Sequence, residues 1–241
     1  MKLRLKVLIG FLIALPMLVG AVTVNVVGGL HKPPYIIQSD DGVSGFEVEF
    51  VERVLEQIGH RSKFVLVPFA RSMKMMNEPN VDAVMTASTR TFSDLSKLSA
   101  PYVTYQNVAV SLSENNLNIQ SVDDLSNHTV ASFQTATKVL GPQFAAAVDK
   151  SPYYFEISTQ QRQIELLLQG KVDVLVLDVH IFKYFNRFAN LKVNIHPIFP
   201  KSEYRLAVKD PALISKFDNQ AKKFKSTRQY SQLLKKYHMT D

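Results

Sequence analysis

Residues 22–67 read VTVNVVGGLHKPPYIIQSDDGVSGFEVEFVERVLEQIGHRSKFVLV, and they contain the two periodicities that identify strands and helices. Residues 22–27 are rich in β-branched side chains and are followed by two glycines, which predicts a strand. Apolar side chains across residues 46–58 recur at the 3.6-residue spacing of an amphipathic helix, with Gly59 as its C-terminal cap. Residues 64–67 predict a second strand. This order of strand, helix and strand is typical of a parallel sheet covered by helices.

The same alternation continues along the chain and starts a second run in its middle. Further strands are predicted at residues 81–85, 129–133, 154–157, 172–177 and 193–198. Helices are predicted at residues 137–148, with an interruption at Gly141 and Pro142, and at residues 159–169 and 179–188. The pattern SVDD at residues 121–124 indicates another helix start. Two such runs predict two α/β lobes.

From Asp210 onward the sequence changes to a helical pattern without strands. Asp210 followed by Pro211 is a strong helix start, since aspartate caps the first turn and proline suits its first position. Two apolar stripes follow, one across residues 213–224 and one across residues 230–237. No low-complexity linker separates the lobes. We therefore expect two short ordered crossings, near residues 106–110 and 200–207.

The first 21 residues have the layout of a secretory signal peptide. Three basic residues precede an apolar run at residues 7–19, and small residues end the segment at Ala21. A membrane anchor is the alternative, but Pro16 interrupts the run, which is shorter than the ~20 residues that a bilayer needs. We expect cleavage after Ala21 and export to the periplasm.

Composition limits the remaining classes of function. Removing the three basic residues of the leader lowers the formal net charge from +7 to +4, and the C-terminal lysines interleave with apolar residues as on a solvated helix face. Nucleic acid is therefore not an expected partner. The chain has no cysteine, which excludes disulfides, thiol catalysis and thiolate metal sites. No second long apolar stretch follows Ala21, so the mature chain is expected to be a soluble monomer.

Seven short segments occur in the order in which one known family has them. They are residues 33–35 (PPY), 45–49 (GFEVE), 81–83 (VDA), 98–102 (LSAPY), 121–125 (SVDDL), 169–173 (QGKVD) and a closing helix that ends at Lys236 and Tyr237. On these segments the chain resembles the extracellular solute-binding proteins of family 3, the amino-acid-binding receptors of ABC importers. The resemblance covers essentially all of the sequence after Ala21.

The resemblance implies the two-lobed type II fold of periplasmic binding proteins, with a mostly parallel sheet in each lobe and two hinge crossings. Lobe 1 would comprise residues 22–107 and 202–241, and lobe 2 residues 108–201. The ligand, an amino acid or a related carboxylate, would lie in the cleft at the carboxyl ends of the strands. Neither a cofactor nor a metal is implied.

The resemblance also implies an arginine that grips a ligand carboxylate with two parallel charge-assisted hydrogen bonds. Arg90, with Thr89 beside it, lies in the expected segment, although the usual position counted back from residues 101–102 falls on Phe92. Arg71 follows the second strand and is the alternative anchor, and both arginines would suit a ligand with two acidic groups. A surface arginine is the alternative interpretation for each.

Other family positions fall on residues of the second lobe. Asp178 would accept hydrogen bonds from the ligand ammonium, and it also suits the N-cap of the following helix. Gln134, Thr135 and Thr137 lie where the family's strand runs into a helix that offers N–H groups to anions. Ala136 replaces a usual glycine there. Asp178 and His180 have no third ligand at a recognisable spacing, so no metal site is expected.

Two aromatic residues of the first lobe, Tyr35 and Phe69, would supply apolar walls of the cleft. His31 and Lys32 occupy a position at which many family members have an aromatic residue that covers the ligand. Together with the two arginines, they favour an anionic or dicarboxylic ligand.

Three functions are compatible with these residues. The leading one is a receptor that closes around its ligand and is recognised by a membrane partner, such as an ABC permease. A periplasmic dehydratase-like enzyme on the same fold is an alternative, with His31, Glu49 or Asp178 as acid or base, although no motif supports it. A ligand-sensing subunit that signals through a separate partner is another. We expect no enzyme activity.

Overall fold

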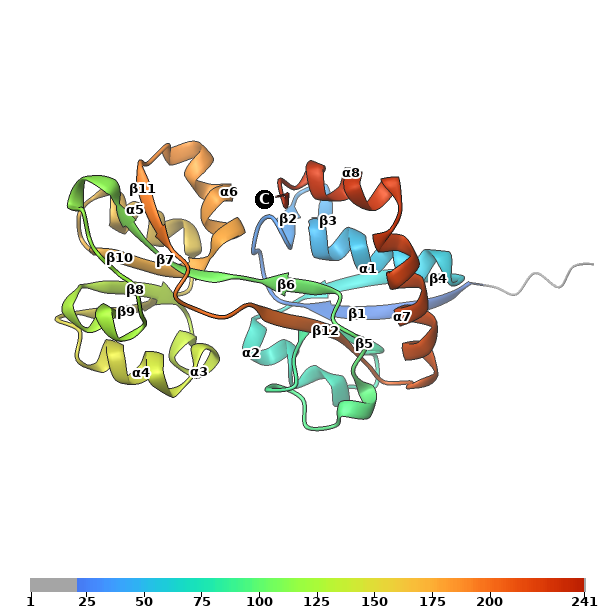
Figure 1. Ribbon diagram of the computed structural model, residues 1–241. Coiled ribbons are helices and arrows are strands. Elements are labelled where there is room, and N and C mark those ends of the chain that lie inside the picture. Colours follow the sequence, from blue (N-terminus) through green and yellow to red (C-terminus); the bar gives the residue numbers. More distant parts are fainter. Residues whose placement is uncertain (1–20, 241) are drawn as a thin grey trace, which may run out of the picture.

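The computed structural model describes residues 21–240, apart from the side chains of Phe69 and Ala70. The predicted leader and its cleavage site precede Val22 and lie almost entirely outside the described residues. Two five-stranded sheets form the cores of two lobes, and two extended segments run side by side between them (Figure 1). The predicted α/β class with two lobes is confirmed.

The first sheet has the strand order β4-β1-β5-β12-β6. Its strands are β1 (Val22–Gly28), β4 (His60–Leu66), β5 (Ala83–Ala87), β6 (Val103–Tyr105) and β12 (Ser202–Val208). Strand β1 pairs in parallel with both β4 and β5, as the alternation of strands and helices predicts. A separate small hairpin is formed by β2 (Ile37–Ser39) and β3 (Gly42–Ser44).

The second sheet has the strand order β11-β7-β10-β8-β9. Its strands are β7 (Asn107–Leu112), β8 (Val130–Phe133), β9 (Tyr154–Ile157), β10 (Val174–Asp178) and β11 (Val193–His196). The pairs β8 with β9 and β8 with β10 are parallel. Every residue of β10 is buried, which explains its continuous apolar run.

Each sheet contains one strand that runs against its neighbours. Strand β12 is antiparallel to β5 and β6, and strand β7 is antiparallel to β10 and β11. Both strands follow a crossing between the sheets. A single residue, Gln106, separates β7 from β6, and residues 197–201 connect β11 to β12. The sheets are therefore mostly parallel, and the reversed strand in each is the one that the chain enters from the other lobe.

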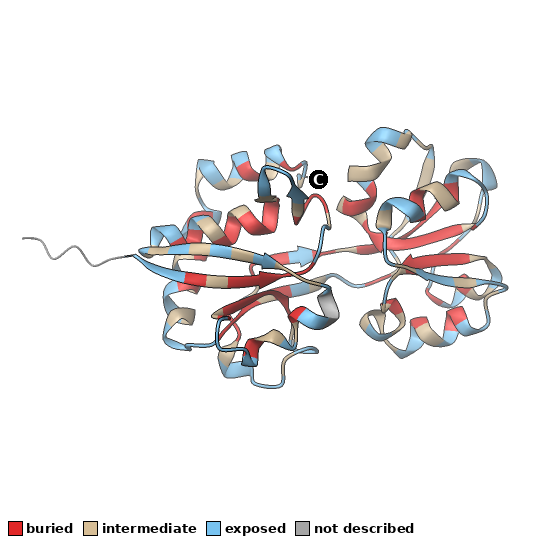
Figure 2. Ribbon diagram, turned by 180° about the vertical axis from the view of Figure 1, so that it is seen from behind, coloured by how far each residue is buried: buried red, intermediate tan, exposed pale blue. Residues whose placement is uncertain are grey.

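Helices cover the first sheet as the two periodic stripes predict. They are α1 (Phe46–Gln57), α2 (Phe69–Ser72), α7 (Ala212–Lys225) and α8 (Arg228–Lys236). The C-terminal helices pack on α1 around Phe50, whose ring centroid lies 5.5 Å from that of Phe224 and 5.6 Å from that of Tyr102. Figure 2 shows the resulting contrast between buried strands and partly exposed helices.

The second sheet is covered by α3 (Ala136–Leu140), α4 (Pro142–Asp149), α5 (Gln160–Leu168) and α6 (Val179–Ala189). The break between α3 and α4 lies at Gly141, as predicted. Short 3-10 helices are Met75–Asn77, Leu95–Lys97, Ser113–Asn115 and Asp123–Asn127.

The SVDD pattern differs from its prediction, because only the last of these 3-10 helices forms there. The Asp124 carboxylate accepts the N–H of Ser121, but the Ser121 hydroxyl also donates to that carboxylate and does not cap the helix.

Candidate ligand-binding site

Two buried carboxylates lie close together where the two sheets meet. Glu47 is 0% exposed and Asp178 is 2% exposed. Glu47 comes from the first turn of α1, and Asp178 ends β10 in the second sheet. With four neighbouring side chains they form a group that we call the junction cluster, which consists of Lys32, Tyr35, Glu47, Tyr102, Tyr105 and Asp178.

Glu47 accepts three hydrogen bonds from hydroxyl groups. The donors are Thr86 Oγ1 at 2.9 Å, Tyr105 OH at 3.0 Å and Tyr102 OH. Gly45 sets the position of this carboxylate, because its φ of 120° and its approach to the Tyr35 carbonyl leave no room for a Cβ atom. Helix α1 can therefore begin directly against the turn that carries Tyr35.

Asp178 is the N-cap of α6, as the sequence predicts. Its Oδ1 accepts the backbone N–H of His180 at 2.9 Å and of Ile181 at 3.1 Å. The same carboxylate accepts the hydroxyl of Tyr35 at 3.1 Å and, through Oδ2, the N–H of Gln106 at 2.8 Å. Burial raises the pKa of Asp178 above its ordinary value, although the neighbouring His180 and these hydrogen bonds oppose the shift.

Tyrosine rings enclose the space beside these carboxylates. The rings of Tyr35 and Tyr105 stack with centroids 3.9 Å apart, and Tyr204 lies edge-on to Tyr105 at 4.8 Å. Burial raises the pKa of Tyr35 and Tyr105 far above the ordinary value. Their hydroxyl groups are therefore neutral donors toward the carboxylates.

The ammonium group of Lys32 is the positive charge within the junction cluster. Its Nζ lies 5.4 Å from the centroid of the Tyr105 ring. Burial lowers the pKa of Lys32, and the charges of Glu47 and Asp178 oppose that shift. The backbone of Lys32 is fixed by a tight turn in which its N–H donates to the carbonyl of Ile36 at 2.8 Å. The same turn presents Tyr35.

Gln106, which lies between β6 and β7, connects the cluster to both crossings. Its N–H donates to Asp178, and its side-chain amide donates to the carbonyl oxygens of Asn107 at 3.0 Å and Phe199 at 2.7 Å. Phe199 belongs to the second crossing. One residue thus joins the two crossings to the carboxylate of the second sheet.

The structure brings two of the predicted residues, Tyr35 and Asp178, into direct contact, whereas the two arginines make other contacts. Arg90 reaches across to the second lobe and donates from Nη1 to the carbonyl of Val139 at 3.0 Å. Arg71 lines a separate 420 Å³ pocket beside β1. Thr89 is exposed, and the side chain of Phe69 lies outside the described residues.

The N–H groups predicted to receive an anion are occupied by the protein itself. The Glu156 carboxylate accepts the N–H of Thr135 at 2.7 Å and of Thr137 at 3.2 Å, and the Thr137 hydroxyl at 3.0 Å. Burial alone would raise the pKa of Glu156, but these hydrogen bonds outweigh it and lower the pKa. The backbone conformation that favours glycine occurs at Thr135, with φ of 67°, and not at Ala136.

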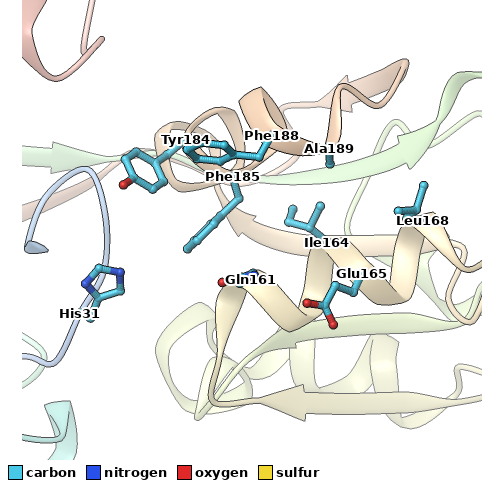
Figure 3. Close-up of a pocket in the computed structure, with 9 residues that line it drawn as sticks. All are labelled: His31, Gln161, Ile164, Glu165, Leu168, Tyr184, Phe185, Phe188 and Ala189. Atoms are coloured by element: carbon cyan, nitrogen blue, oxygen red, sulfur yellow. The ribbon is translucent and has the colours of Figure 1, made fainter. Parts of the chain in front are cut away.

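An open groove of 380 Å³ lies next to the cluster, between α5 and α6 (Figure 3). Phe185 points into it from α6, Ile164 lies on the α5 side, and His31 faces it from the loop after β1. Leu168 and Phe188 are 57% and 78% exposed at its edge. Most of this apolar surface belongs to α5 and α6, and Asp178 is the N-cap of α6.

Sequence reasoning missed Glu47, Tyr102, Tyr105 and Glu156 as parts of a site. A signal for Glu47 was present, because it lies on the same helical face as Val51 and Val54 and is therefore a carboxylate within an apolar stripe. The pairing of Glu156 with α3 has no comparable signal, since it depends on the register of β9 beside β8.

Two further classes of feature are missing from residues 21–240. No group of three or more histidine, aspartate or glutamate side chains in this range could hold a metal ion. Among the same residues, no helix is both long and apolar enough to cross a membrane.

The family model of the bacterial extracellular solute-binding proteins, family 3, matches residues 24–240. The chain belongs to this family. A curated relative, the probable amino-acid-binding protein YxeM of Bacillus subtilis, is 26% identical over 150 residues, which are 59% of this chain and 54% of that protein. The chain therefore matches only about half the length of that relative. The family is one of extracellular solute-binding proteins, and the name of this relative is that of an amino-acid-binding protein.

Solved structures show the same fold at low identity. The P235GK mutant of ArgBP from T. maritima has a TM-score of 0.72 at 19% identity, with 90% of this chain and 96% of that chain covered. A substrate-binding protein of an ABC uptake transporter from Streptococcus pneumoniae, with bound histidine, has a TM-score of 0.73 at 13% identity, with 91% and 93% covered. The type II periplasmic-binding fold of this family-3 protein is thus confirmed.

Proposed function

We propose that the protein binds one small solute with an ammonium group, an amino acid or a related amine, at the junction cluster, and releases it unchanged. The observation that carries this proposal is that two buried carboxylates from different lobes, Glu47 and Asp178, accept hydrogen bonds from the stacked tyrosines Tyr105 and Tyr35. A buried carboxylate is retained at little cost only where a cation or several hydrogen-bond donors face it. Both kinds of partner are present around this pair.

The chemistry of the cluster favours an ammonium over an anion. The carboxylates attract a positive charge strongly because water is largely excluded around them. The faces of Tyr35 and Tyr105 add an electrostatic attraction for a cation. Of the two arginines considered as carboxylate anchors, Arg71 lines a separate pocket. Arg90 lies within electrostatic reach of Tyr204, but its guanidinium donates to the Val139 carbonyl, and Glu156 already takes the N–H groups of α3. The site thus supports recognition of the amino group more than of a dicarboxylate.

The lobes proposed to close around this solute are residues 22–107 with 202–241, and residues 108–201. Glu47 and Tyr35 belong to the first and Asp178 to the second, so the full set of contacts forms only when the lobes are together. We further propose that the mature chain is periplasmic after cleavage at Ala21 and delivers its solute to an ABC-type importer. The description of the Streptococcus pneumoniae neighbour supports an uptake role.

The test is a binding screen of residues 22–241 by thermal shift and calorimetry, using amino acids, amines and dicarboxylates together with their deaminated analogues. Amine-bearing compounds are expected to bind, and a solute at 100 times its Kd stabilises the fold by roughly 2.7 kcal/mol. The solute must be recovered unchanged after incubation. Stabilisation by deaminated acids alone, or consumption of the solute, would refute the proposal.

A matched pair of variants locates the site on α1. Glu47→Gln keeps the shape of the side chain and one of its two acceptor oxygens but removes the charge. It is expected to weaken binding of an ammonium solute by about tenfold, the equivalent of about 1.4 kcal/mol. Glu56→Gln, on an exposed face of the same helix, serves as the control and should bind as the wild type does. Equal affinities of the two variants would place the solute elsewhere.

A further inference from the structure

The junction cluster already contains an ammonium group, supplied by the chain itself. Lys32 places Nζ over the ring of Tyr105, within electrostatic reach of both Glu47 and Asp178. A lysine side chain carries its ammonium on a four-carbon stem, which makes it a primary alkylamine attached to the backbone. Its chemistry is that of the solute proposed above.

Lys32 compensates part of the charge of the two buried carboxylates. Glu47 and Asp178 are 0% and 2% exposed and both act on Lys32, and hydroxyl and N–H donors alone leave their net charge uncompensated. One internal cation removes half of that charge. A solute ammonium at the same place would compete with Lys32 for the same oxygens and the same ring face.

We infer that Lys32 is an internal ligand of the solute site, and that an ammonium-bearing solute binds by displacing its side chain. The inference rests on the proposed function, since it concerns the same site. Lys32 thereby makes the site specific for cationic groups. A solute without a cationic group cannot supply the positive charge that the cluster loses when the Lys32 side chain leaves.

The surroundings of Lys32 allow this exchange. As a residue Lys32 is half-buried, although its ammonium is buried, and the preceding His31 is exposed, so this end of the cluster borders the solvent. The turn between Lys32 and Ile36 fixes the backbone of Lys32, so the exchange would move its side chain alone. The released ammonium regains full hydration, which offsets part of the loss of its contacts with the carboxylates.

The first experiment replaces the side chain by a free amine. Lys32→Ala removes the atoms from Cγ to Nζ, which correspond to n-propylamine. The variant is expected to melt at a lower temperature than the wild type, and n-propylamine near neutral pH should raise that temperature. 1-Propanol, which has the same shape without the charge, should not. In the wild type and in Lys63→Ala, which lacks an exposed lysine of β4, n-propylamine has to compete with Lys32, so the response should be clearly smaller.

Two results of this experiment would overturn the inference. One is the absence of any response of Lys32→Ala to n-propylamine. The other is a response of the wild type as large as that of the variant. Because n-propylamine is the probe, this experiment does not depend on knowing the natural solute, and its failure is distinct from a failure of the proposed function.

The second experiment uses the sign of an affinity change, in a variant that retains the packing of the stem. Lys32→Met and the control Lys63→Met are titrated with L-arginine, L-histidine and L-glutamine by calorimetry. Removing an internal competitor raises the fraction of binding-competent sites, so Lys32→Met should bind at least one of these about tenfold tighter than the wild type. Weaker binding would mean that Lys32 contacts the solute directly, which contradicts displacement.

The two experiments separate the possible failures. Tighter binding by Lys32→Met supports both proposals together. Weaker binding by Lys32→Met overturns the proposal that Lys32 is an internal ligand, but it leaves the proposed solute-binding function in place. If no variant binds any of the three amino acids, the receptor proposal is contradicted for these solutes, and the response to n-propylamine then decides the inference by itself.

Discussion

Two helices that cover the second sheet, α6 and α3, each have a carboxylate at their first N–H groups. The two carboxylates differ in their origin, their burial and the direction of their pKa shift. Asp178 caps its own helix and is buried in the junction cluster, whereas Glu156 reaches α3 from strand β9 and is exposed. Burial raises the pKa of Asp178, while hydrogen bonds lower that of Glu156. Hydrogen bonds from helix N–H groups therefore stabilise the charged form of Glu156, whereas the same kind of bonds does not prevent the charged form of Asp178 from being costly. The difference in burial explains the opposite directions of the two pKa shifts.

The largest effect is expected from removing the buried carboxylate. Asp178→Ala leaves four donors without their acceptor and Lys32 without one of its counter-charges, and it should lower the free energy of unfolding by about 3 kcal/mol, as for a broken buried ion pair. Urea unfolding followed by circular dichroism measures this change. The control is Asp149→Ala, an exposed carboxylate at the end of α4, which should be nearly neutral. A loss equal to that of the control would show that the junction cluster is not a stabilising network.

A smaller loss is expected at the exposed carboxylate. Glu156→Ala removes the acceptor of Thr135 and Thr137, and the loss of a helix-capping acceptor costs about 1 kcal/mol. The same urea unfolding assay applies, with Glu114→Ala in the same lobe as the control. A loss as large as that of Asp178→Ala would contradict the argument that burial separates the two sites.

The smallest effect, and the sharpest comparison, is the dependence of stability on pH. Glu156 has a lowered pKa, so its contribution is complete above the ordinary value of 4.5 and is lost as pH falls through the folded value. Asp178 has a raised pKa, so the folded state binds its proton more readily, and stability falls as pH rises above the ordinary value of 3.8. Lys32, Tyr35 and His180 lie around Asp178 and are unchanged in both variants.

Urea unfolding between about pH 3 and pH 6 tests these signs, since stability rises with pH wherever the unfolded state holds more protons. Relative to the wild type, Glu156→Gln should show a weaker rise of stability with pH, and Asp178→Asn a stronger one. Shifts of the same sign in both variants would show that the two carboxylates do not respond to burial as described.

The helices and strands were predictable because they depend on local periodicity. The stripe of α1, the break at Gly141 and the continuous apolar run of β10 each have one explanation in the sequence, and the structure confirms them. The boundaries are less exact: β4 starts at His60, four residues before the predicted strand, where alternating polar residues hide the pattern.

The candidate site was only partly predictable, because a sequence does not show which polar groups are satisfied within the fold. Asp178 and Tyr35 were found, and their contact agrees with a shared location. Arg90 was considered for its charge, but its guanidinium bonds to the Val139 carbonyl. The N–H groups of α3 fit an anion in principle, yet the register of two parallel strands gives them Glu156.

Gln106 gives the two-lobed design a mechanical consequence. Its amide connects the two crossings through Phe199, and its N–H holds Asp178, so both connecting segments and one oxygen of the site share a single residue. The crossings cannot twist independently of each other or of that oxygen while these bonds last. A change in the angle between the two sheets would therefore have to move this residue, and with it the Asp178 oxygen that it holds.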